Sequence, residues 1–84
     1  MADEIRKIER VQTGVRLEKR VLKVLKAVAS KHDMSMGELL EGILLHNFEG
    51  KLPFSEETLT FIEAMRMAHG LDLTAKDSHI MKED

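Results

Sequence analysis

The sequence predicts a mainly α-helical protein with one β-strand, because three patterns occur in order along its 84 residues. Residues 10–17 alternate between apolar and polar side chains, as a half-buried strand does. Two segments with helical spacing of apolar residues follow and end near residue 50. A third helix begins near residue 55, so we expect a strand, two helices and a C-terminal helix.

The size and composition of the chain restrict how this fold is supported. A domain of 84 residues has a marginal core and often needs disulfides, metals or oligomerisation. The sequence has no cysteine, which excludes disulfides and thiolate metal sites and leaves oligomerisation as the expected support. No apolar run approaches the roughly 20 residues of a membrane span. We therefore expect a soluble, cytoplasmic protein without a membrane partner.

The charge is distributed unevenly along the chain. Residues 1–34 carry nine Lys or Arg and five Asp or Glu, whereas residues 35–84 carry four and ten. A concentrated basic segment favours a polyanionic partner, most often nucleic acid. The alternative at this point is a solvated helix face that acidic neighbours balance.

The strand pattern predicts a second copy of the chain. We expect residues 1–9 to form a flexible charged arm and residues 10–17 to form the strand. Since the other periodic segments are helical, the strand has no partner within one chain. Antiparallel pairing with its copy gives an intertwined homodimer with a two-stranded intermolecular sheet. One face of this sheet, Val11, Thr13, Val15 and Leu17, would be buried, and Arg10, Gln12, Gly14 and Arg16 would face outward.

The helices follow from periodicity and from signals at their ends. The first is expected from Glu18 to about His32. Ser35 and Glu38 form a capping-box pattern that opens the second, and Gly50 is well placed to end it. Residues 51–84 form a C-terminal extension, with one helix at about 55–69 and a tail. The apolar positions of the first two helices include Val21, Leu22, Val24, Leu25, Val28, Ala29, Leu39, Leu40, Ile43, Leu44 and Phe48.

This order resembles the ribbon-helix-helix family of DNA-binding proteins, the Arc and MetJ superfamily. The matching run is residues 11–48, in which strand alternation precedes the helix pattern and the Ser35-x-x-Glu38 start. The resemblance implies that residues 10–50 are a dimerisation and DNA-binding domain that inserts its β-ribbon into the major groove. It implies base contacts from Gln12, Gly14, Arg16 and Arg10.

Further roles follow from the same resemblance. The start of the second helix, at Ser35, Met36 and Gly37, would hold a DNA phosphate, with Lys19 adding attraction. The dimer core would contain Val11, Thr13, Val15, Leu17, Leu22, Leu25, Leu40, Ile43 and Leu44. Gly14 departs from the pattern because it offers no side chain to a base. Close backbone approach, weaker specificity and lost base readout all remain open.

The expected function is therefore a sequence-specific DNA-binding transcriptional regulator, a repressor or autoregulator. It would bind double-stranded DNA as a homodimer, with higher assembly on DNA possible. One alternative is an antitoxin whose residues 51–84 bind a toxin, and another is a dimeric interaction module that has lost DNA binding. We expect no enzymatic activity, cofactor or metal, because no catalytic arrangement is recognisable and the four histidines are far apart in sequence.

Overall fold

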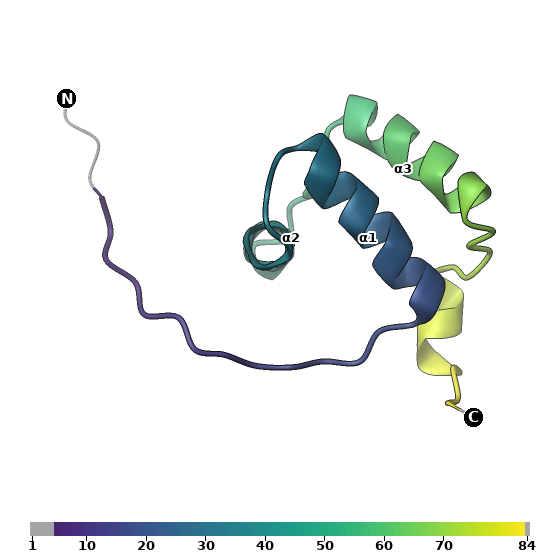
Figure 1. Ribbon diagram of the computed structural model, residues 1–84, viewed down its shortest axis with the longest axis horizontal. Coiled ribbons are helices and arrows are strands. Elements are labelled where there is room, and N and C mark those ends of the chain that lie inside the picture. The colour runs from purple at the N-terminus through teal and green to yellow at the C-terminus, as the bar shows by residue number, and fades with distance from the viewer. Residues whose placement is uncertain (1–4, 84) are drawn as a thin grey trace.

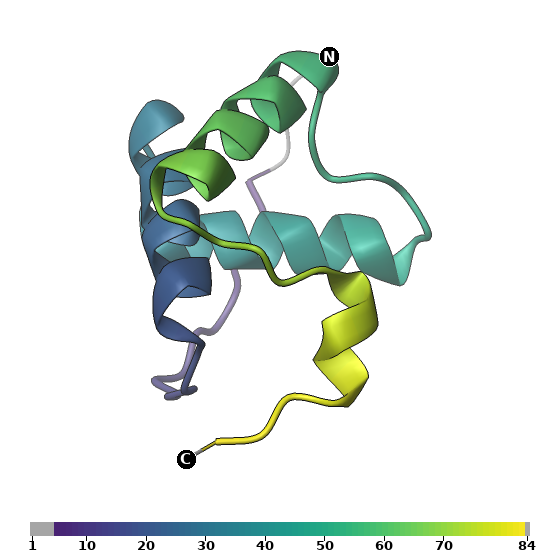
Figure 2. The same cartoon turned by 90° about the vertical axis from the view of Figure 1, so that its right-hand side faces the viewer.

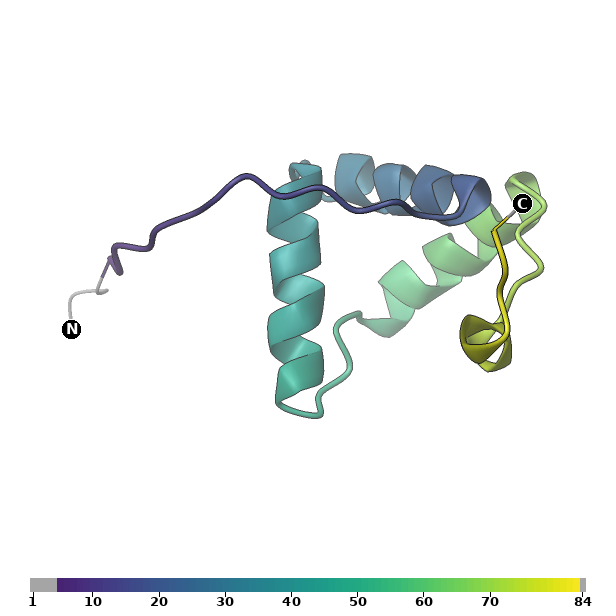
Figure 3. The same ribbon diagram turned by 90° about the horizontal axis from the view of Figure 1, so that it is seen from below.

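The computed structural model describes residues 5–83, which contain three α-helices and a short 3-10 helix. These elements are α1 (Lys19–Lys31), α2 (Met36–Phe48), α3 (Glu56–Ala68) and η1 (Ala75–His79). Helix α1 packs against both α2 and α3, and it lies between them in Figure 1. Figure 3 shows α2 running across the end of α1 and not alongside it. None of the helices in residues 5–83 is long and apolar enough to span a bilayer.

The predicted fold class is wrong, because residues 5–83 contain no β-strand. Residues 10–17 are irregular, and the described chain is a small three-helix protein without the two-stranded sheet of an intertwined dimer. Alternating side chains show only that an extended segment would have an apolar face. A strand also requires a neighbouring backbone that accepts and donates its ladder hydrogen bonds. Every other periodic segment within residues 5–83 is a helix, so these residues supply no such neighbour.

The signals at the helix starts were interpreted correctly. The capping box of α2 is confirmed, since Glu38 N donates to Ser35 Oγ at 3.1 Å and Ser35 N donates to Glu38 Oε1 at 3.0 Å. Ser55 caps α3 by accepting from the backbone N–H of Thr58. Glu18 lies just before α1 as its N-cap and not within the helix. The polar side chains therefore satisfy N–H groups that the helices leave free.

All three helices end through a residue in the left-handed region of backbone space. These residues are Asp33 (φ 57°), Gly50 (φ 73°) and Gly70 (φ 65°). The next N–H in each case bonds back to a carbonyl five residues earlier, as in the 2.8 Å bond from Leu71 N to Arg66 O. This geometry is the Schellman motif, in which glycine is favoured and aspartate is tolerated. The expected end of α2 at Gly50 is confirmed.

The core lies between α1 and the helices that pack against it, whose arrangement Figure 2 shows. Its buried apolar residues are Val24, Val28, Ala29, Leu39 and Leu71. Helix α3 contributes Phe61, Ile62 and Met65 as partly buried neighbours, whereas its Leu59 is 47% exposed. Thr58 is buried instead. Part of the C-terminal extension therefore completes the core of the helices before it.

Candidate nucleic-acid interface

Residues 5–17 form an extended segment that runs into the start of α1. We call it the N-terminal segment, and every one of its residues is exposed. Figures 1 and 3 show it leaving α1 and passing beyond α2. Among the described residues its backbone makes no hydrogen bond to the helices. Arg6, Lys7, Arg10 and Arg16 against Glu9 give it a net charge of +3.

The residues expected to contact bases all lie on this segment. Gln12 and Gly14 are exposed between Arg10 and Arg16, and residues two apart in an extended chain point to the same side. At about 3.3 Å per residue, Arg10 and Arg16 stand roughly 20 Å apart along an extended backbone. This spacing covers about six nucleotides of one DNA strand, since successive phosphates advance 3.4 Å.

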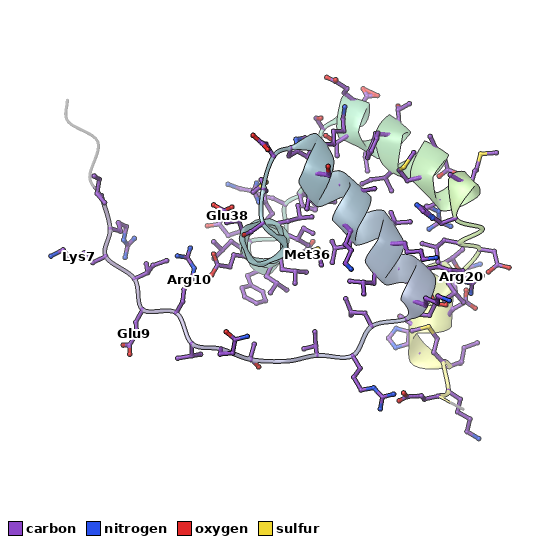
Figure 4. The ribbon with its side chains drawn as sticks, viewed as in Figure 1. Lys7, Glu9, Arg10, Arg20, Met36 and Glu38 are labelled. Carbon is purple, nitrogen blue, oxygen red and sulfur yellow. The ribbon has the colours of Figure 1, made fainter. Side chains whose placement is uncertain are left out.

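Arg10 does not stand free from the helices. Its Nε donates to Glu41 Oε2 and its Nη2 to Glu41 Oε1, both at 2.8 Å. In Figure 4 the Arg10 side chain points toward α2 on the side where Glu38 lies, whereas Lys7 and Glu9 point elsewhere. The Arg10 hydrogen bond lowers the pKa of Glu41, and the same bond raises the pKa of Arg10. The two groups therefore form a two-point ion pair between the N-terminal segment and α2.

Arg16 also has an acidic partner within the chain. Its guanidinium forms an ion pair with Glu83, which follows η1 near the C-terminal end. Both side chains remain largely exposed, at 86% and 63%. The pair is therefore accessible to water and to external anions.

The start of α1 is linked to the C-terminal extension through Arg20, labelled in Figure 4. Glu18 accepts from the backbone N–H groups of Arg20 and Val21, and the latter bond is the main reason why its pKa is lowered. The Arg20 guanidinium bonds Glu18, the Gly70 carbonyl at 2.8 Å and Asp72 at 3.1 Å. The Glu18 carboxylate also offsets the basic residues Lys19 and Arg20 at the positive end of the α1 dipole. Lys19 itself is exposed.

The expected phosphate site at the start of α2 already contains a carboxylate. Met36 is half-buried and Gly37 is exposed, and both lie in the first turn. Glu38 bonds the N–H of Ser35, and that hydrogen bond lowers the pKa of Glu38. A negative charge at this position satisfies the helix dipole that a phosphate oxygen would otherwise use. The start of α2 is therefore already capped by Ser35 and Glu38.

The residues expected in a dimer core remain accessible in the single chain. Leu22, Leu25, Leu40 and Ile43 are partly buried, whereas Leu44 is 48% exposed and Val11, Thr13, Val15 and Leu17 are exposed. On α2, Leu45 and Phe48 are also exposed, at 65% and 78%. The chain exposes 7679 Å², against roughly 5,100 Å² for a compact monomer of its mass. The N-terminal segment, which is exposed throughout, adds to this surface, and the apolar core contains five buried residues.

Two histidines line a groove of about 260 Å³ between α2 and the start of α3. His32 Nε2 lies 3.1 Å from the buried Thr58 Oγ1, and His46 Nδ1 lies 2.7 Å from the Gly42 carbonyl. Each ring is therefore engaged by its own surroundings. In the described part of the chain, no three His, Cys, Asp or Glu side chains lie close enough to hold a metal ion.

The structure thus brings the expected base-contacting residues onto one segment and keeps the expected phosphate site apart, on α2. Sequence reasoning missed the acidic partners Glu41, Asp72 and Glu83, since no local pattern connects them to arginines so far away in the chain. A scan against protein-family models, a search of curated proteins and a search of solved structures found no match to this chain. The family resemblance therefore stays a prediction.

Proposed function

We propose that this chain is a sequence-specific DNA-binding regulator that contacts DNA through its N-terminal segment. The observation that carries the proposal is an exposed, extended segment of net charge +3 next to a small helical domain. An extended basic segment follows a DNA groove or strand, and its arginines neutralise phosphates. This mode of contact does not involve a β-ribbon.

The side chains of the N-terminal segment suit two kinds of DNA contact: phosphate contacts, which position the protein, and contacts to base edges, which distinguish sequences. Arg10 and Arg16 are able to pair with phosphates, and an arginine that reaches a base edge makes two hydrogen bonds with guanine. Gln12 has the donor and acceptor pair that suits adenine. Gly14 lets the backbone approach the duplex closely, because glycine carries no side chain. We therefore assign the preference for particular bases to Gln12 and Arg16.

We propose further that the regulator acts as a homodimer. The exposed apolar side chains of α2 argue for a partner, because burying them against another surface removes them from water. Leu44, Leu45 and Phe48 on α2 supply apolar side chains for such an interface. A second copy of this chain is the simplest partner, because two-fold assembly buries the same patch on both subunits.

The experiment is a titration of a fluorescently labelled, mixed-sequence duplex at low salt, followed by anisotropy. The Arg10→Ala/Arg16→Ala variant should bind at least about tenfold more weakly than the unchanged chain. The matched control is Lys51→Ala/Lys76→Ala, which removes two exposed cations outside the segment. Absence of binding by the unchanged chain, or equal losses in both variants, would contradict the proposal. Selection of bound fragments from a random DNA pool then tests sequence preference.

A second candidate is a dimeric interaction module without DNA binding. The exposed apolar side chains of α2 and the acidic second half of the sequence favour it. Light scattering should give a dimer mass under both hypotheses, and Leu44→Glu/Phe48→Glu should give a monomer. A dimer that binds no duplex at low salt would favour this module over the regulator.

The antitoxin alternative has less support. A segment that wraps a toxin has to be available for it, whereas α3 packs on α1 and Leu71 is buried. Arg20 ties Gly70 and Asp72 to the start of α1. Resistance of residues 51–73 to protease in the isolated chain would agree with this packed arrangement. Rapid cleavage within that range, prevented by a partner, would favour the antitoxin.

A further inference from the structure

Both arginines that we assign to DNA contact are paired with acidic residues of the same chain. Glu41 of α2 holds Arg10 at two points, and Glu83 beyond η1 holds Arg16. We propose that these two carboxylates form an intramolecular restraint that holds the N-terminal segment and competes with DNA for its arginines. This inference rests on the proposed function, because it names the regulation of that same site.

The geometry of the Arg10 pair makes the competition direct. A guanidinium uses the same fork of N–H donors for a carboxylate as for a phosphate. Nε and Nη2 of Arg10 are both engaged by Glu41, so this edge is closed to a phosphate while the pair persists. Glu38, which adds to the negative field at Arg10, lies one turn earlier on α2. Phosphate binding along this edge of Arg10 therefore requires the segment to leave α2.

The second pair restrains the other end of the segment. Glu83 belongs to the C-terminal end of the chain, and Figure 1 shows that end near the start of α1. Arg16 lies three residues before the first residue of α1. The two restraints are independent, because α2 supplies one and the extension supplies the other. Removing both should therefore release the segment more completely than removing either one.

The strength of the pairs suits a reversible restraint. The side chains of Arg10 and Glu41 are 61% and 45% exposed, and those of Arg16 and Glu83 are more so. Exposed pairs are weak individually, so each reduces DNA affinity by about two- to fivefold at most. The apparent dissociation constant rises by the reciprocal of the fraction of chains whose segment is free. DNA, which offers several phosphates at once, still displaces both carboxylates.

The first measurement compares DNA affinity in two variants of equal charge. Glu41→Gln/Glu83→Gln removes the restraint and keeps the side-chain shapes. The control, Glu49→Gln/Glu63→Gln, removes carboxylates that pair with Lys51 and Arg66 and not with the segment. Both double variants change the net charge by the same amount. We expect the first to bind a duplex about 4- to 25-fold more tightly than the control, since two independent restraints of two- to fivefold each are removed.

The second measurement detects the restraint without DNA. The chain has no cysteine, so a nitroxide attached at Gln12→Cys reports on the N-terminal segment alone. The label should become more mobile in Glu41→Gln/Glu83→Gln and stay unchanged in Glu49→Gln/Glu63→Gln. Circular dichroism of both variants checks that the helices remain folded.

The two measurements separate failure of the restraint from failure of the proposed function. Equal label mobility in both variants, with equal DNA affinities, would overturn the restraint and leave the regulator intact. Absence of DNA binding in every variant would overturn the proposed function and the competition together. Greater label mobility with tighter binding in the restraint variant alone would support the inference.

Discussion

The guanidinium of Arg10 and the carboxylate of Glu41 form a two-point ion pair with both nitrogen–oxygen distances at 2.8 Å. The two residues are 31 positions apart, yet the pair connects the N-terminal segment to α2. It is one of the two contacts on which the regulation inferred above depends. It also has a measurable effect on how Glu41 takes up protons.

We predict that Glu41 titrates below its ordinary pKa of 4.5, because the Arg10 hydrogen bond favours its charged form. A pKa that is lower in the folded chain gives stability that is present above the ordinary pKa and is lost as the pH falls through the folded value. Nuclear magnetic resonance titration of the carboxyl carbons measures this pKa directly. Arg10→Ala should raise the pKa of Glu41 toward 4.5.

Glu18 is the internal control for that titration. The backbone N–H of Val21 is the main cause of its lowered pKa, so Arg10→Ala should leave the pKa of Glu18 unchanged. If Glu41 titrates at the same pH with and without Arg10, the ion pair does not form in solution.

Two glycines should respond to alanine in opposite directions. Gly42 lies inside α2, where an added Cβ meets nothing within 4 Å. Gly42→Ala should raise the free energy of unfolding by about 0.5–1 kcal/mol, because alanine loses less entropy in a helix. Gly70→Ala should lower it by about 1–2 kcal/mol, since φ is 65° there and a Cβ disfavours the left-handed region.

Urea unfolding curves measure both changes. Gly14→Ala in the N-terminal segment is the matched control, and we expect it to shift stability by less than about 0.5 kcal/mol. Stabilisation by Gly70→Ala would contradict the Schellman end of α3.

Helix ends were predictable from the sequence because each depends on residues only a few positions apart. Ser35 and Glu38 satisfy each other's backbone groups within one turn, and Gly50 ends α2 through bonds to its last turn. The end of α1 near His32 was also predictable, although an aspartate, Asp33, and not a glycine takes the left-handed conformation there. Local chemistry determines these features, so one sequence is enough to interpret them.

The segment at 10–17 was predicted wrongly because strand formation is not local. Its alternation of Val11 and Val15 with polar neighbours is real, but both valines are exposed, at 79% and 72%. The acidic partners of Arg10 and Arg16 were invisible for a similar reason, since ion pairs between distant positions leave no periodic signal. The basic charge of the N-terminal segment was therefore visible in the sequence. The ion pairs that hold its arginines were visible only in the folded chain.

Arg20 should hold the C-terminal extension on α1. It bonds the Gly70 carbonyl and Asp72, which lie on either side of the buried Leu71. Arg20→Ala should increase amide hydrogen exchange across residues 71–79 by about two- to tenfold, because local opening becomes easier. Lys26→Ala, an exposed change on the same helix, should leave exchange there unaltered. Unchanged exchange in Arg20→Ala would show that Leu71 packing alone fixes the extension.

The most direct test of the account is the salt dependence of DNA binding. The logarithm of the association constant should fall linearly with the logarithm of salt concentration, by about 0.9 for each phosphate neutralised. In the Arg10→Ala/Arg16→Ala variant the slope should be smaller by about one for each arginine that contacts a phosphate. A salt-independent affinity, or the same slope in the variant and the unchanged chain, would contradict DNA binding through the N-terminal segment.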